Sequence, residues 1–126
     1  MKHTIAPPNE KDLRKIVESN KNTAFVALEA NPHKDTLRYM ASGLTPVIAR
    51  IMARQHNAIG IDIVYLRHKE KKEKAMALAR IKQNIFLARK AGTSLAIPAS
   101  HPEGYYLLLS LGASTNQAKK ARAQSF

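Results

Sequence analysis

Hydrophobic residues recur at helical spacing between Ser42 and Gln55, and an almost uninterrupted apolar run follows from Ala58 to Val64. The apolar positions of the first segment fall at i, i+3, i+4, i+7 and i+8 and are Leu44, Val47, Ile48, Ile51 and Met52. Thr45 can cap a helix that begins at Pro46, which has no amide hydrogen to satisfy. The apolar run is typical of a parallel strand covered on both faces. Together they predict one helix followed by one buried strand, the building unit of an α/β domain.

The rest of the chain alternates in the same way. The expected elements are an extended lead over 1–8, a helix over about 9–19, a strand over 23–30, a loop with at most one helical turn over 33–41, a long helix from within 67–74 to about 91, a strand over 94–100, a helix over 103–111 and a basic helix or tail over 116–126. Gly92 and Gly112 suit helix ends, and Pro98 makes the last strand short or places it near an edge. No flexible linker divides the chain, so we expect one α/β domain over residues 1–126.

The chain carries 21 Lys and Arg residues against 9 Asp and Glu residues, a formal net charge of +12. Such an excess opposes compact folding unless an anionic partner relieves it. A hydrophobic content of 44% predicts a packed domain and not a disordered basic tail. The absence of cysteine excludes disulfides and thiolate metal sites, and no signal peptide or apolar membrane span is visible. We therefore expect a soluble cytoplasmic protein.

Basic residues without neighbouring acids are the strongest functional signal in the sequence. No carboxylate side chain occurs between Lys74 and Glu103. In the segment RHKEKKEK, lysines alternate with two glutamates, and ion pairs along a helix would explain that segment as a solvated face. Tyr105 and Tyr106 are candidates for base stacking, although a tyrosine in an apolar helix more often belongs to the core. The residues expected to contact RNA phosphates are Lys69, Lys71, Lys72, Lys74, Arg80, Lys82, Arg89, Lys90, Lys119, Lys120 and Arg122.

Catalytic motifs are scarce. The five histidines form neither a His-x-His nor a His-Glu-x-x-His arrangement, and the chain has no Gly-rich phosphate loop and no Gly-x-Ser-x-Gly elbow. An enzymatic alternative is a small metal-dependent phosphoesterase, because polar residues near strand ends supply the candidate groups Glu29, His33, Asp62 and His101. Such residues more often cap neighbouring helices.

Three phrases match one protein family in their order and spacing: SGLTPVIARIMARQHNAIGIDI (42–63), RIKQNIFLARKAGTSLAIPAS (80–100) and LLLSLGASTNQAKKA (107–121). Over roughly its C-terminal two-thirds, the chain resembles the TIM-barrel-related protein subunit of archaeal and eukaryotic ribonuclease P, the class of about thirty kilodaltons. The matching positions are Ser42, Gly43, Leu44, Ala58, Ile59, Gly60, Asp62, Arg80, Asn84, Ala88, Arg89, Lys90, Ser100, Leu111, Gly112, Gln117, Ala118 and Lys119.

The resemblance implies an RNA-binding protein component of ribonuclease P that has no catalytic residues and no metal of its own. In this family the catalytic RNA removes the 5′ leader from precursor tRNA with magnesium, and a second small protein subunit helps to stabilise that RNA. The implied fold is a barrel of the polymerase-and-histidinol-phosphatase-like type. On this resemblance Ser42, Gly43 and Asp62 maintain the fold. A generic basic RNA-binding module unrelated to tRNA processing is the remaining alternative.

The chain is too short for the whole family barrel, which takes roughly 200 residues or more. We therefore expect a reduced or partial (βα) barrel with three to four parallel strands and surrounding helices. A partial barrel exposes strand edges and apolar helix faces. The chain is then expected to self-associate or to dock on another subunit, and the sequence leaves open which of the two supplies the missing strands.

Overall fold

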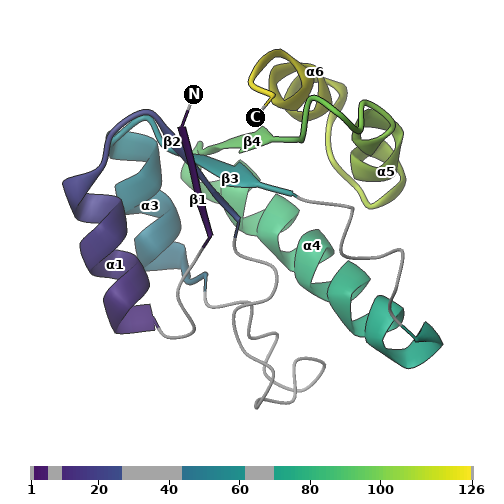
Figure 1. The fold of residues 1–126 in the computed structure, drawn as a ribbon, viewed down its shortest axis with the longest axis horizontal. Helices are drawn as coiled ribbons and strands as arrows, with labels where there is room; N and C mark the ends of the chain where they lie inside the picture. Colours follow the sequence, from purple (N-terminus) through teal and green to yellow (C-terminus); the bar gives the residue numbers. More distant parts are fainter. Residues whose placement is uncertain (1, 6–9, 27–43, 62–69, 126) are drawn as a thin grey trace.

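The computed structural model of the chain describes residues 2–5, 10–26, 44–61 and 70–125. Its elements, in chain order, are β1 (Lys2–Ile5), α1 (Glu10–Ser19), β2 (Thr23–Val26), α3 (Pro46–Arg54), β3 (Ala58–Gly60), α4 (Lys71–Ala91), β4 (Ser94–Ala96), α5 (Gly104–Ser110) and α6 (Thr115–Ala123). Helices and strands alternate as the sequence predicted, so the domain is mixed α/β (Figure 1).

The four strands form one parallel sheet in the order β1-β2-β3-β4. Residues 2–5, expected only as an extended lead, pair with β2 with Lys2 opposite Thr23. No local pattern identified this strand, because the pairing with β2 that defines it joins residues 21 positions apart. The strand order never reverses, which distinguishes this sheet from doubly wound folds. Right-handed crossovers in such an order put the connecting helices on one face of the sheet.

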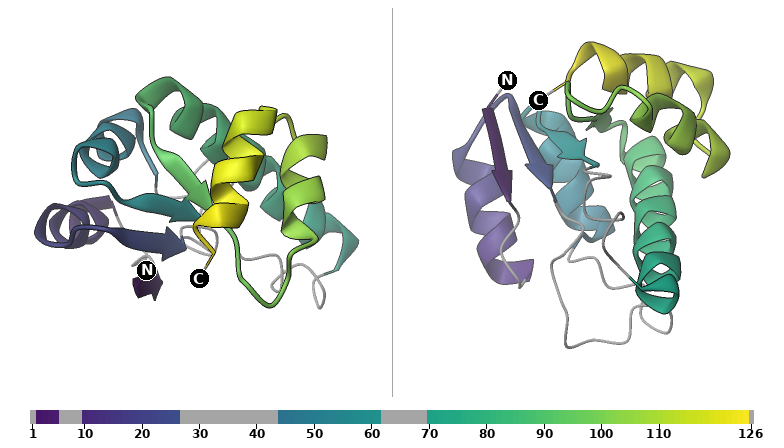
Figure 2. Two further views of the ribbon diagram at one scale, coloured as in Figure 1. Left: turned by 90° about the horizontal axis from the view of Figure 1, so that it is seen from above. Right: turned by 45° about the vertical axis from the view of Figure 1, so that its right-hand side comes forward.

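Helices α1, α3 and α4 form a layer in chain order, and α5 and α6 pack on each other. Helix α1 packs on α3, α3 packs on α4, and α6 packs on β4 and on α5. Figure 2 shows α1, α3 and α4 around one side of the sheet, with α5 and α6 beside the β4 edge. This sequential arrangement is the one a βα barrel uses over part of its circumference.

The two faces of the sheet carry side chains of very different size. Ile59, Ile61, Leu95 and Ile97 belong to the main core with the buried residues of the helices. Ala58 and Ala96, also fully buried, form a separate small cluster, and the register pairs Ala58 with Ser94 and Gly60 with Ala96. In β3 and β4, the helix-covered face therefore supplies the apolar volume of the core, and the other face carries the small residues Ala58, Gly60, Ser94 and Ala96.

Buried polar side chains connect elements that lie far apart in sequence. The Asn57 side chain accepts a hydrogen bond from the Thr23 amide at 3.1 Å and donates to the carbonyls of Val17 and Asn20 at 3.3 and 3.1 Å. The Thr93 hydroxyl donates to the Ala49 carbonyl at 2.6 Å. Asn57 therefore ties the end of α1 and the start of β2 to the start of β3.

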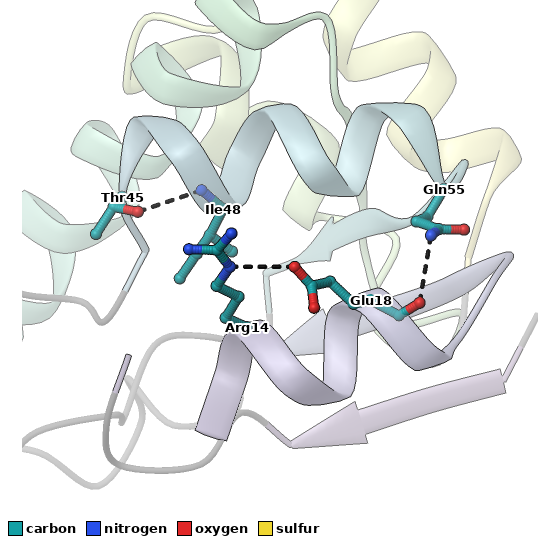
Figure 3. Close-up of polar contacts among 5 residues, drawn as sticks. All are labelled: Arg14, Glu18, Thr45, Ile48 and Gln55. Carbon is teal, nitrogen blue, oxygen red and sulfur yellow. Dashed lines mark hydrogen bonds and ion pairs between the residues drawn. The ribbon is translucent and has the colours of Figure 1, made fainter. Parts of the chain in front are cut away.

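The contact between α1 and α3 has a capped helix start and polar links on its surface (Figure 3). Thr45 accepts a hydrogen bond from the Ile48 amide at 3.2 Å, and Pro46 is the first residue of α3, as the sequence predicted. Gln55, after α3, donates to the Glu18 carbonyl at 3.2 Å, and Arg14 pairs with the Glu18 carboxylate at 3.1 Å. Helix α3 ends at Arg54, and two residues later His56 takes a left-handed backbone with φ of 57°.

Several boundaries and burial assignments differ from the sequence-based prediction. Helix α4 begins at Lys71, within the range predicted for its start, whereas β4 ends at Ala96, four residues before the predicted end of that strand. Val47, one of the apolar positions at helical spacing, is 43% exposed, and Phe86 of α4 is 53% exposed. Both lie at the edge of an apolar stripe, where helical spacing alone does not distinguish core from rim. The predicted continuations of two strands (27–30 and 62–64) and the loop at 33–41 lie outside the described residues. No helix in the described ranges is both long and apolar enough to cross a membrane.

Candidate nucleic-acid interface

The first turns of α4 present three lysines to solvent. Lys71, Lys72 and Lys74 are exposed, as are the two glutamates Glu70 and Glu73. Among the described residues, none of these lysines forms an ion pair with either glutamate. Self-neutralisation, the alternative explanation of this segment, therefore has no contact to support it here. Lys69, predicted with this group, lies outside the described residues.

Farther along α4, two of the predicted cations differ in their surroundings. Lys82 is exposed. Arg80 is only half-exposed and its Nε atom is buried, one turn before the fully buried Asn84. Lys82 is therefore the more accessible of the two to a phosphate.

Arg89 connects α4 to the turn between α5 and α6. Its Nε and Nη2 atoms donate to Gln117 Oε1 at 3.2 and 3.1 Å, and Nη2 also donates to the Gly112 carbonyl. Gln117 in turn completes a capping box with Ser114 and donates from Nε2 to the Ile85 carbonyl at 3.3 Å. The Arg89 side chain thus has a structural role that its charge pattern did not reveal.

This arrangement joins two of the three sequence phrases quoted above. Arg89 belongs to the phrase at 80–100, and Gly112 and Gln117 belong to the phrase at 107–121. Arg89 lies 23 residues before Gly112 and 28 residues before Gln117, and the three residues meet at one hydrogen-bonded junction. Residues of both phrases therefore hold α4 to α6 and to the turn before it.

Helix α6 carries the remaining predicted cations. Lys119, Lys120 and Arg122 are exposed, while Ala118 and Ala121 on the same helix are buried in the core. The Arg122 guanidinium lies 4.4 Å from the centre of the Tyr105 ring, a cation–π contact.

The two tyrosines of α5 lie in different surroundings. Tyr105 packs against the core, as expected for a tyrosine in an apolar helix, while Tyr106 is 70% exposed and meets the Tyr105 ring edge-on at 5.1 Å. Of the pair, only Tyr106 has a ring accessible to a base.

A groove lies between α3 and α4, and sequence analysis did not identify it. Its volume is about 380 Å³, and its lining residues are Pro46, Arg50, Gln83, Phe86, Leu87, Lys90 and Ala91. Lys90 Nζ lies 5.6 Å from the centre of the exposed Phe86 ring. The signal for this groove was the aromatic residue at the edge of the α4 stripe, next to cations without acids.

The candidate groups of a phosphoesterase are mostly outside the described residues: Glu29, His33 and Asp62. His101 is described and lies half-buried, with Nδ1 2.8 Å from the Ser100 hydroxyl. The parts of the chain that the structure describes hold no group of three His, Asp or Glu residues suited to a metal ion.

Comparison with known proteins adds no assignment. The chain matches no protein-family profile, and a search of curated proteins finds no significant relative.

Proposed function

We propose that this chain is an RNA-binding protein component of ribonuclease P, which assists the catalytic RNA in removing the 5′ leader from precursor tRNA. The chain does not cut RNA itself in this proposal. Its exposed cations neutralise phosphates of the folded catalytic RNA, and a second small protein subunit acts with it. Magnesium acts with the RNA.

The observation that carries the proposal is the set of exposed cations on two adjacent helices. Lys71, Lys72, Lys74, Lys82 and Lys90 on α4 and Lys119, Lys120 and Arg122 on α6 reach solvent. Arg89 joins these two helices through Gln117, so their cations are held on one rigid support. Glu70 and Glu73 alternate with Lys71, Lys72 and Lys74 in the first turns of α4 without an ion pair between them, and no acid lies beside Lys82 or Lys90 on this helix. Fixed, exposed cations in excess over acids suit the closely spaced phosphates of a folded RNA.

The strand order gives independent support for the family resemblance. Four parallel strands in sequential order, with helices on one side, fit a partial βα barrel of the polymerase-and-histidinol-phosphatase-like type. Within the described residues, β1 and β4 each pair with one strand only, so both sheet edges lack a second strand. We propose that a second copy or the partner subunit completes the barrel at these edges.

Reconstitution of the holoenzyme tests the proposal directly. The catalytic RNA and its partner protein are mixed with labelled precursor tRNA at low magnesium, with and without this chain, and leader removal is measured. We expect faster cleavage when the chain is present. Equal cleavage without it would exclude a role in ribonuclease P. Cleavage of a phosphodiester by the purified chain with manganese or zinc, abolished by Asp62→Ala, would instead favour the phosphoesterase.

Charge variants test which cations engage the catalytic RNA. If about five phosphates are contacted, the slope of log affinity against log salt is about −3.5 to −4.5. Replacing Lys71, Lys72 and Lys74 by glutamine should reduce the size of this slope by about 2 to 3. The exposed lysines Lys15 in α1 and Lys21 after it provide the control. An equal effect per lysine replaced in the two sets would mean that net charge, and not the α4 surface, determines binding.

A further inference from the structure

The groove between α3 and α4 combines three features that phosphate binding alone does not require. The Phe86 ring is 53% exposed although it lies in the half of α4 that packs on the core. Leu87 and Ala91 extend the apolar lining beside it, and Gln83 adds a side-chain amide. The groove has a volume of about 380 Å³, which is large enough for a small ligand, and the exposed Phe86 ring gives it one flat apolar wall.

The charge at the groove is entirely positive. Arg50 from α3 and Lys90 from α4 are both exposed and both line it, and no acidic residue belongs to the lining. Pro46 places the first turn of α3 at the groove, where the helix dipole adds positive potential. The ligand that matches this lining therefore has an apolar face and a negative charge in the same unit.

We propose that this groove binds an unpaired nucleotide of a single-stranded RNA, with the base stacked on Phe86 and the adjoining phosphates contacted by Arg50 and Lys90. Aromatic rings flanked by cations are the usual platform for single strands, because every base has a face that can stack. Lys90 Nζ lies 5.6 Å from the ring centre, at the long end of cation–π distances. That ammonium can therefore turn to a phosphate at little cost. Gln83 is placed to donate to or accept from a base edge.

The groove adds a function that the exposed lysines of α4 and α6 do not supply. Lysines at the surface bind phosphates in a duplex or a single strand alike, whereas a stacking ring requires a base that has left its helix. The groove would thus direct the chain toward loops, bulges or single-stranded ends of an RNA. This property does not depend on ribonuclease P and is measurable with the purified chain alone.

The test uses two labelled oligonucleotides of about eight nucleotides, one of uridines and one with the same phosphates but abasic sugars. Fluorescence anisotropy measures the affinity of the full chain for each. Phe86→Ala should weaken uridine binding by roughly 5- to 150-fold, the range found for removing one stacked base. Phe86→Ala should change the affinity for the abasic strand by no more than about twofold relative to the unmodified chain, because no base is present to stack. Phe86→Trp should restore the uridine affinity.

Matched variants separate stacking from charge and from damage to the fold. Val47→Ala removes an exposed apolar side chain of α3 that is not part of the groove lining and should leave both affinities unchanged. Arg50→Gln or Lys90→Gln should weaken the intact and the abasic strand alike and lower the salt slope by about 0.7 each. Circular dichroism establishes that each variant is folded.

Three results would overturn the inference. The first is equal affinity of the chain for the uridine and abasic strands. The second is an unchanged uridine affinity in Phe86→Ala. The third is a glutamate-rich peptide whose binding depends on Phe86 while RNA binding does not, which would identify an acidic protein segment as the occupant. If uridine binding does not depend on Phe86 but the chain still speeds leader removal in the reconstituted holoenzyme, the groove proposal is wrong and the ribonuclease P proposal stands. If uridine binding depends on Phe86 but the chain has no effect on leader removal, the ribonuclease P proposal is wrong and the groove proposal stands.

Discussion

The two halves of α4 lie in different surroundings, although one uninterrupted helix of 21 residues forms both. From Lys71 to Arg80 no side chain is fully buried, and the N-terminal end of the helix extends away from the sheet (Figure 1). From Ile81 to Ala91 the helix packs on α3, β4 and α6, with Ile81, Asn84, Ile85, Leu87 and Ala88 buried. The first half is thus held mainly by its own helix propensity and the second by packing.

The difference shows how one helix can serve a fold and a partner at once. The exposed half is rich in lysine, glutamate, alanine, leucine and methionine, which are strong helix formers and need little tertiary support. The packed half gives the helix its fixed direction. The lysines of the exposed half therefore keep the fixed spacing of a helix while their side chains stay exposed to solvent.

Cavity-forming substitutions should give the largest contrast between the two halves. Ile85 is 2% exposed, so Ile85→Ala should lower the free energy of unfolding by about 2–5 kcal/mol. Leu78 is only partly buried in the exposed half, so Leu78→Ala should cost about 1 kcal/mol. Urea unfolding measures both. Equal losses would show that the first half is packed as tightly as the second.

Removal of the Arg89 side chain should have the next largest effect. Arg89→Ala breaks the hydrogen bonds to Gln117 and Gly112, and because the guanidinium is partly exposed we expect a loss of about 1–2 kcal/mol. A double-mutant cycle with Gln117→Ala should give a coupling energy of at least about 0.5 kcal/mol. Lys90→Ala, next in sequence, is the control and should be close to neutral. No coupling would mean that α4 and α6 are held by packing alone.

The end of the packed half depends on a left-handed residue. Gly92 has a φ of 77° and open space around its Cβ position, so Gly92→Ala should cost about 1 kcal/mol through backbone strain and not through a clash. Gly92→Asn should cost less, because asparagine tolerates this conformation. Thermal unfolding of the two variants measures the difference. A larger loss for asparagine would point to a steric cause.

The smallest effect on stability is expected at the lysines of the exposed half. Replacing Lys71, Lys72 and Lys74 by glutamine should change the free energy of unfolding by no more than about 0.5 kcal/mol, because these exposed side chains make no ion pair with Glu70 or Glu73. The same triple variant should lose affinity for RNA. A large loss of stability would assign these lysines to the fold.

Elements with strong local signals were predicted correctly from sequence. Helix α3 starts where the Thr45 hydroxyl caps its first turn and the Pro46 ring needs no amide partner. Helix α4 ends at Gly92, which has no side chain to oppose a left-handed backbone. All three effects act within a few residues of the chain. β1 was missed because its register is set by pairing with β2 across the intervening helix, and no local pattern encodes that. Burial at the edge of a stripe, as at Phe86, is likewise decided by the neighbouring helix.

The candidate interface divides in the same way. Charge pattern correctly located exposed lysines at Lys71, Lys72 and Lys74 but placed Arg89 in the same class, although its guanidinium bonds to residues 23 and 28 positions away. A positive side chain looks the same in sequence whether its partner is a phosphate or a distant carbonyl. The groove was missed because its two walls come from separate helices.

The sequential order of the sheet has a consequence for how the chain is made. Thr23 pairs with Lys2, Ala58 with Ala24, and Ser94 with Ala58, so every strand emerging from the ribosome finds its partner already synthesised. The loop closed at each step spans 21 to 36 residues, which keeps the entropic cost of each addition small. The sheet can therefore form one strand at a time during translation, before the C-terminal residues have been synthesised.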